Sequence, residues 1–270
     1  AGNWEHGNSI LLRNETDVAV AEAFKITVEE LKSKIDAAKV KLMQVRNSRI
    51  KPGLDDKILS SWNALMITGY AKAYRVFGEE AFLNAAVTNA NFLLKKAIAA
   101  DGEMTRNYKN GRSSINALLD DYAFTIAAFI ELYQATFDEK WLTEANKITS
   151  YTMEHFFDAS SGMFFYTHNQ YADLIARKME LSDNVIPSSN SEMAKNLFLL
   201  GHFLNKDEYI SKAKQMLINV EADVQRNIYF YANWGMLQAL FTSPLYEVAI
   251  MGDDFKNKRQ QFDEHYLPTV

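Results

Sequence analysis

The feature that most constrains the fold is a helical hairpin that occurs three times in the 270-residue chain. In its clearest copy, 118–145, an apolar helix over 122–133 is followed by a break near 137–138 and by a second helix that opens at Trp141. Moving this copy back by 59 residues matches it to 63–86 without a gap, and moving it forward by 68 residues matches it to the stretch that contains 200–213. One structural plan therefore runs through the chain.

In each hairpin an apolar helix precedes an amphipathic one. A helix that is apolar on most sides is buried, whereas an amphipathic helix has a solvent-facing side and lies outside. The repeat is longer than the tetratricopeptide and armadillo units, which have about 34 and about 40–47 residues. The pattern instead predicts a mainly α-helical fold, an incomplete α/α toroid in which an inner ring of helices is enclosed by an outer ring.

The remaining segments fit around this plan. We expect a loop over 1–26, a helix that starts with a capping box at Thr27 and Glu30, and about four hairpins within a partial toroid, 1–242. Small β-hairpins are expected over 102–112, with an Asn-Gly turn, and over 161–181, with a turn at 168–170. The tail, 243–270, predicts a βα unit with a strand over 246–252 and a helix over 253–265. The expected helices are 57–77, 79–99, 192–204, 206–224 and 227–241.

Composition excludes several classes of protein. The net charge is −5 without a long basic run, which argues against a nucleic-acid partner. No apolar run approaches the ~20 residues of a membrane span, so we expect a soluble, cytoplasmic domain. The chain has no cysteine, so disulfides and thiolate metal sites are absent. Because it begins Ala-Gly-Asn-Trp, without an initiator Met or a signal segment, we expect it to be part of a longer protein.

The internal register brings polar positions together. It aligns Trp62 with Asp121 and Ser189, and Asn63 with Tyr122 and Asn190, near the entrances of successive inner helices. Equivalent positions of a toroid point to equivalent places, so we expect a central pocket of carboxylates, amides, hydroxyls and aromatic faces. That mixture suits a sugar. The expected ligand-contacting residues are Asp55, Lys57, Trp62, Asn63, Asp120, Tyr122, Ser188, Ser189 and Asn190.

Each of these residues also has a structural interpretation. Aspartate and serine are common helix caps, which could explain 55–56, 120–121 and 188–191. Trp62 could be a core residue as well as a platform for a ligand. The histidines at 155, 168 and 202 share no spacing, and no pair has the i, i+4 arrangement of metal ligands. No phosphate-binding loop or nucleophile elbow occurs. We therefore predict neither a metal nor a cofactor.

Four segments resemble one family, the thioredoxin-domain-containing proteins related to spermatogenesis-associated protein 20. Its DDK-x4-WN element falls on 55–57 and 62–63, its DDYA element on 120–123, and its PSGNS element on 187–191, where Ser189 replaces the glycine. The opening AGNWEHGNSIL is similar as well. The resemblance implies a toroid like those of six-hairpin glycosidases and N-acylglucosamine 2-epimerases. It also implies an N-terminal thioredoxin-like domain, absent from this sequence, as a partner, and earlier hairpins outside it.

Three functions follow from these observations. The first is a carbohydrate-processing or carbohydrate-binding domain, in which Asp121 and either Asp56 or Asp183 are the acid and base candidates. A separation of ~5–5.5 Å between two such carboxyl groups predicts retention, and ~6.5–9.5 Å predicts inversion. The second is an epimerase, which needs a proton shuttle such as histidine, and none lies in these motifs. The third is a non-catalytic scaffold that presents partners to the thioredoxin-like domain.

Overall fold

The structure, a computed structural model, describes residues 2–170 and 176–265. Its internal contacts divide the chain into two compact units, Ala1–Asp55 and Asp56–Val270. This division differs from the sequence-based boundary, which lies between 242 and 243. Each unit is described by itself.

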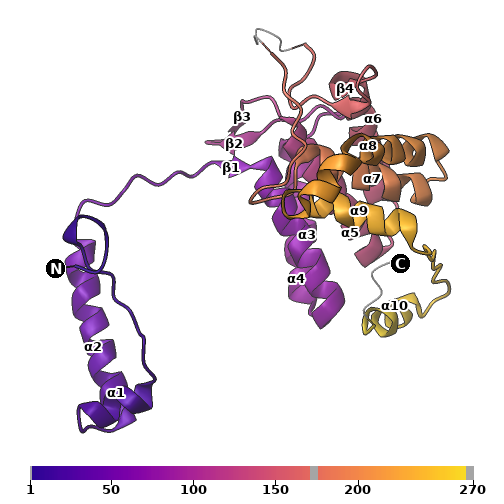
Figure 1. The fold of residues 1–270 in the computed structure, drawn as a ribbon. Helices are drawn as coiled ribbons and strands as arrows, with labels where there is room; N and C mark the ends of the chain where they lie inside the picture. The colour runs from indigo at the N-terminus through magenta and orange to yellow at the C-terminus, as the bar shows by residue number, and fades with distance from the viewer. Residues whose placement is uncertain (1, 171–175, 266–270) are drawn as a thin grey trace. The chain divides into compact units, whose positions relative to one another are not determined.

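The first unit contains a short 3₁₀ helix, η1 (Glu5–Gly7), and two α-helices, α1 (Asp17–Ala23) and α2 (Val28–Asn47) (Figure 1). The expected capping box opens α2: the Glu30 N–H donates to Thr27 Oγ1 at 3.1 Å, and the Thr27 N–H donates to Glu30 Oε2 at 2.9 Å. The prediction of a loop over 1–26 is wrong where α1 forms. That helix has only 7 residues, too few to show a helical period in the sequence.

The second unit is built from helical hairpins in two rows (Figure 1). Its helices are α3 (Ser60–Phe77), α4 (Glu80–Lys96), α5 (Leu119–Thr136), α6 (Lys140–Phe156), α7 (Ser189–Phe203), α8 (Asp207–Arg226), η2 (Ile228–Phe230), α9 (Ala232–Thr242) and α10 (Phe255–Asp263). In the inner row α3 packs against α5, α5 against α7, and α7 against α9, while α4, α6 and α8 each pack on the inner helix that precedes them in sequence. The mainly α-helical toroid plan is therefore confirmed.

Helix α5 is the centre of this unit, and 13 of its 18 residues are buried. It contacts α3, α6 and α7, so its apolar surface is covered on several sides. The ring of Phe129 meets that of Trp141 on α6 with centroids 5.2 Å apart. A helix without a hydrophilic face is stable only when neighbours surround it, which is why the most apolar stretch of the sequence lies here.

Two small antiparallel sheets lie at the end of the bundle where the inner helices begin (Figure 1). Strands β1 (Ile58–Leu59), β2 (Asn107–Lys109) and β3 (Arg112–Ser113) form one sheet, and β4 (Phe157–Asp158) pairs with β5 (Met163–Phe164) in the other. The Asn110-Gly111 turn has φ values of 51° and 80°, as the first expected hairpin requires. In the second, one turn at 159–162 joins β4 to β5, and a further turn lies at 169–170, within the expected 168–170; the residues that follow it, 171–175, lie outside the described residues.

Three other expectations are wrong. Helix α3 begins at Ser60 and not at Lys57, because β1 occupies the preceding residues. Trp62 is 66% exposed and is not a core residue of this unit. Residues 246–252 form no strand, since no other segment of the described chain pairs with them, and only the helix of the expected βα unit is present, as α10.

Candidate functional site

The first turn of α5 holds a buried carboxylate pair on one arginine. The side chain of Asp121 is fully buried; its Oδ1 accepts from the Ser61 N–H at 2.9 Å, and its Oδ2 from the Leu118 N–H at 3.1 Å. Arg106, in the segment before β2, donates from Nη1 to Asp121 Oδ2 at 2.8 Å and to Asp120 Oδ1 at 2.9 Å. Asp121 therefore joins the first turns of α3 and α5 and also fixes the arginine.

Two carboxylates share a single guanidinium here, and their burial and mutual repulsion affect the protonation of Asp121. Burial, and then the negative charge of Asp120, raise the pKa of Asp121 to about 6 against the opposing effect of Arg106. Burial lowers the pKa of Arg106, but the two carboxylates outweigh it and raise that pKa. Burial and Asp120 also raise the pKa of the Tyr166 hydroxyl. The cluster can thus hold or release a proton close to neutral pH.

A second buried carboxylate, Asp183, lies between α7 and α9. Its Oδ1 accepts from the Ser188 N–H at 2.8 Å and from the Ser191 hydroxyl at 2.9 Å, and its Oδ2 accepts from the Asn233 N–H at 2.8 Å. Glu192 continues this network, because its Oε2 accepts from the Asn233 amide at 2.9 Å and from Lys195 Nζ at 2.8 Å. Asp183 therefore joins two helix starts, as Asp121 does.

The Pro-Ser-Ser-Asn-Ser stretch fixes the start of α7 to the sheet beside it. Asn190 donates its amide to the Phe164 carbonyl at 2.9 Å and accepts from the Phe164 N–H at 2.8 Å. The Ser188 hydroxyl caps the helix at the Ser191 N–H, and the carboxylate of Glu180 accepts from the Ser189 N–H at 2.9 Å. Ser189 starts α7 with an ordinary negative φ, so the serine that replaces the family's glycine fits without backbone strain.

The other expected site residues are not gathered around these carboxylates. Asp56 is exposed and pairs with Lys109 Nζ at 2.5 Å, and this hydrogen bond lowers the pKa of Asp56. Asn63 donates its amide to the Leu59 carbonyl at 2.8 Å. Tyr122 is buried, and its hydroxyl accepts from the Met104 N–H at 3.0 Å. Asp55 ends the first unit, and Lys57 is exposed before β1.

Sequence reasoning missed Arg106 and Tyr166. A signal for Arg106 did exist: two adjacent aspartates at the start of a buried helix require a cation, because an unpaired buried charge is strongly unfavourable. The sequence offers several basic residues, and its pattern does not say which one folds back onto the pair. Tyr166 is one of several aromatic residues in 164–166, and no spacing distinguishes it.

A pair of histidines, also missed, lies at the same end. The rings of His155 and His168 stack with centroids 4.5 Å apart and planes 19° apart. His168 Nε2 lies 3.1 Å from the Tyr151 hydroxyl, and His168 Nδ1 accepts from the Gln170 N–H at 3.0 Å. Burial, and then His155, lower the pKa of His168. Tyr151 in turn stacks on Tyr122 of α5, with planes 9° apart.

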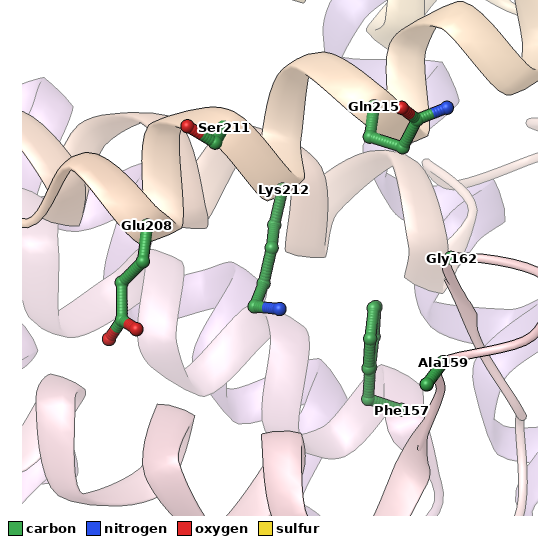
Figure 2. A pocket seen from close by; sticks show the side chains of 7 residues that line it. All are labelled: Phe157, Ala159, Gly162, Glu208, Ser211, Lys212 and Gln215. Carbon is green, nitrogen blue, oxygen red and sulfur yellow. The ribbon is translucent and has the colours of Figure 1, made fainter.

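A cavity lies elsewhere in the second unit. Its volume is about 420 Å³, and it lies between α8 and the turn that joins β4 to β5 (Figure 2). The described residues that line it are Phe157, Ala159, Gly162, Glu208, Ser211, Lys212 and Gln215, and none of them is an expected site residue. This cavity lies against the outer helix α8, away from the expected site residues, so it is not the candidate site.

Sequence comparison confirms the expected resemblance. The chain is 33% identical to an uncharacterized protein of Caenorhabditis elegans over 77% of its length, and 29% identical to human spermatogenesis-associated protein 20 over 80% of its length. It spans 29% of the length of each. No protein-family profile matches the chain. In the described part of the chain, no helix has the length and apolar character needed to cross a membrane.

Solved structures show the same fold. A GH76 α-mannanase of Bacteroides thetaiotaomicron aligns with a TM-score of 0.55 at 18% identity, over 70% of this chain and 54% of that one. A D-mannose isomerase aligns with a TM-score of 0.51 at 16% identity, over 61% and 40% of the two chains. A cellobiose 2-epimerase of Bacillus thermoamylovorans gives 0.50 at 15% identity, over 60% and 43%. The second unit therefore has the α/α toroid fold found in carbohydrate-acting proteins.

Proposed function

We propose that this homologue of spermatogenesis-associated protein 20 binds a carbohydrate at the end of the bundle where its inner helices begin. The observation that carries the proposal is the cluster at the start of α5, in which Arg106 joins Asp120 and Asp121 beside Tyr166. Carboxylates, a guanidinium and a phenol are groups that bind sugar hydroxyls. The solved structures of the same fold supply further support, since their names include a mannanase, a mannose isomerase and a cellobiose epimerase.

Within the pair we assign the ligand contact to Asp120. Asp121 is fully buried and accepts from three donors, whereas Asp120 keeps 7% of its surface exposed. In this assignment Asp121 positions Arg106 and tunes the charge of the pair. If the ligand is hydrolysed, the raised pKa of Asp121, about 6, lets this carboxyl hold a proton that can be given to the leaving oxygen. Asp183 and Asp56 remain the candidates for the carboxylate that activates water.

The epimerase alternative has an observation of its own. Epimerisation next to a carbonyl needs groups that remove and return a proton near neutral pH, and His155 and His168 lie close to Tyr151 at this end of the bundle. The scaffold alternative is favoured by the fact that Asp121 and Asp183 both hold helix starts together. If Asp121 and Asp183 have only this structural role, the domain can still bind a ligand without converting it.

Thermal denaturation with a panel of mono- and oligosaccharides tests the proposal, because a ligand that binds only the native state raises its midpoint. We expect a rise in the complete polypeptide, its loss in Asp120→Asn, and its persistence in the matched control Asp223→Asn on α8. A panel that leaves the midpoint of the complete polypeptide unchanged would favour the scaffold. Incubation of a bound sugar in D2O distinguishes epimerisation, which places deuterium on carbon, from binding alone.

A further inference from the structure

The segment that follows β5 is held against the last turn of α6 around one buried histidine. His168 exposes 2% of its surface. Its ring stacks on that of His155 and meets the ring of Phe156 edge-on, with centroids 4.5 and 5.4 Å away. The next residue, Asn169, donates its N–H to the His155 carbonyl at 3.0 Å. His155 and Phe156 both belong to α6, so these contacts fix 168–169 to that helix.

Hydrogen bonds define which ring nitrogen of His168 carries the proton. The Gln170 N–H donates to Nδ1 at 3.0 Å, so Nδ1 is an acceptor and holds no proton. The neutral ring therefore has its proton on Nε2, which lies 3.1 Å from the Tyr151 hydroxyl of α6 and donates to it. The ring thus connects the backbone of its own segment to a side chain of α6.

A second proton on this ring is incompatible with those contacts. In a charged imidazole both nitrogens are donors, so the Nδ1–H would face the Gln170 N–H, which is a donor as well. The positive charge would also lie in a buried position, stacked on His155. The observed conformation of 168–170 therefore requires a neutral His168.

Neighbouring segments supply charged groups that act on His168 in both directions. Burial, and then His155, lower the pKa of His168. Glu103, in the segment before β2, raises this pKa, and Arg177, in the segment before α7, lowers it. The lowering effects outweigh that of Glu103, so the pKa of His168 lies below its ordinary value of 6.5. Tyr151 is a further titratable side chain in contact with the ring.

The same segment carries one residue of the candidate site. Tyr166 lies two positions before His168, and its carbonyl accepts from the Leu119 N–H at the start of α5 at 3.0 Å. Burial and the negative charge of Asp120 raise the pKa of the Tyr166 hydroxyl, so this hydroxyl lies beside the carboxylate pair. The segment 166–170 is therefore bound to α5 at one end and to α6, through His168, at the other.

We propose that His168 is a pH-sensitive anchor: its protonation detaches 166–170 from α6, so that Tyr166 is held beside Asp120 only while His168 is neutral. The stabilisation that this anchor gives is complete above about pH 6.5 and is lost as pH falls through the lower pKa of the folded chain. The proposal does not depend on the carbohydrate proposal, because it concerns the conformation of this segment and not its ligand.

A local measurement is needed, because protonation of Asp121 stabilises the fold over an overlapping range of pH. Hydrogen exchange with mass analysis on the complete polypeptide provides it, in peptides that cover 164–170, with each rate corrected for the intrinsic effect of pH. Between pH 7.5 and pH 5 we expect the protection of this segment to fall about tenfold or more, while peptides of α8 keep theirs.

Two variants and a control assign the effect to His168. His168→Asn offers Oδ1 as an acceptor near the position of Nδ1 and does not titrate, so its protection should be the same at both pH values. Glu103→Gln removes the carboxylate that favours the charged ring, so the midpoint of the loss should move to lower pH. His202→Asn, at a histidine of α7 that pairs with Glu247, should behave like the parent chain.

Three results would overturn the inference. Equal protection of 164–170 at pH 7.5 and pH 5 in the parent chain would show that His168 does not control the segment. A loss of protection that persists in a folded His168→Asn variant would assign the effect to another group. A midpoint that is unchanged or higher in Glu103→Gln would overturn the inference even if His168→Asn does not fold.

Discussion

Asp121 is an ionisable residue whose side chain has no exposed surface. Three hydrogen-bond donors offset the energetic cost of burying its carboxylate. Two of those donors are backbone N–H groups in or next to the first turns of two helices, where such groups have no partner within the helix. The third is Arg106. One side chain therefore combines helix capping, helix-to-helix bonding and charge pairing.

Removing this side chain should destabilise the second unit. Asp121→Ala leaves the N–H groups of Ser61 and Leu118 without an acceptor and takes one carboxylate from Arg106, so we expect a loss of about 3 kcal/mol or more in the free energy of unfolding. Urea denaturation at pH 7 measures it. Asp223→Ala, which removes a carboxylate from the surface of α8, should change that free energy by less than about 1 kcal/mol. Equal effects of the two substitutions would contradict this account of Asp121.

The raised pKa of Asp121 also predicts a pH dependence. Between its ordinary pKa of 3.8 and about 6, the native state holds a proton that the unfolded chain has released. The stabilisation that this proton gives is present at low pH and is lost as pH rises through about 6, and it amounts to about 3 kcal/mol.

The measurement is the free energy of unfolding of the parent chain minus that of Asp121→Asn, which lacks this titration. This difference should fall between pH 4 and pH 6.5 and stay level above pH 7. A difference that rises over the same interval would mean that Arg106 outweighs burial and Asp120.

At the scale of the helices, Asp183 joins α7 to α9 through the Ser188 and Asn233 N–H groups. Asp183→Ala should therefore loosen the first turns of these two helices while α5 and α6 keep their contacts with each other. Hydrogen exchange with mass analysis should show faster exchange in peptides that cover 186–194 and 230–236, and unchanged exchange over 119–156. Faster exchange throughout the second unit would instead show that Asp183 supports the whole bundle.

A glycine marks the close approach of α7 and α8. A Cβ at Gly201 would meet Ile210 Cγ1 at 2.4 Å and the Ile210 nitrogen at 3.1 Å, so something must shift to admit it. We expect Gly201→Ala to lower the free energy of unfolding by about 1–3 kcal/mol. Gly69→Ala, with open space around it, should raise that free energy by about 0.5–1 kcal/mol through helix propensity. Thermal or urea denaturation of the pair tests both signs, and a stabilised Gly201→Ala would refute the close packing.

The elements were predictable from sequence where the pattern was long and repeated. The hairpins α3–α4, α5–α6 and α7–α8 follow from apolar periodicity, and the Asn110-Gly111 turn follows from residue type. The prediction of a strand over 246–252 was wrong, because a strand forms only against a partner strand, and local sequence does not reveal whether the chain supplies one. Arg106 and the stacked histidines were missed for the same reason: their neighbours are distant in sequence and adjacent only after folding.

For the molecule as a whole, the division after Asp55 separates two bodies with their own contacts. Residues 50–57 between them are exposed and lie outside any helix. Trypsin at low dose should therefore cleave first after Arg49, because the bond after Lys51 precedes Pro52 and resists trypsin, and a fragment that begins at 50 and retains the second unit should accumulate. Mass analysis of the digest identifies it. Early cleavage at Lys147 or Lys195, which lie within packed helices, would contradict the division.

The bond between Asp121 and the Ser61 N–H has a consequence for biosynthesis. The two residues are 60 positions apart, and the acceptor belongs to the later helix. During translation α3 emerges first, with its opening turn lacking this acceptor and its inward face bare, and it stays so until α5 has been made. The hairpin α3–α4 therefore leaves the ribosome before α5–α6, but it reaches its final structure only after α5 has been synthesised.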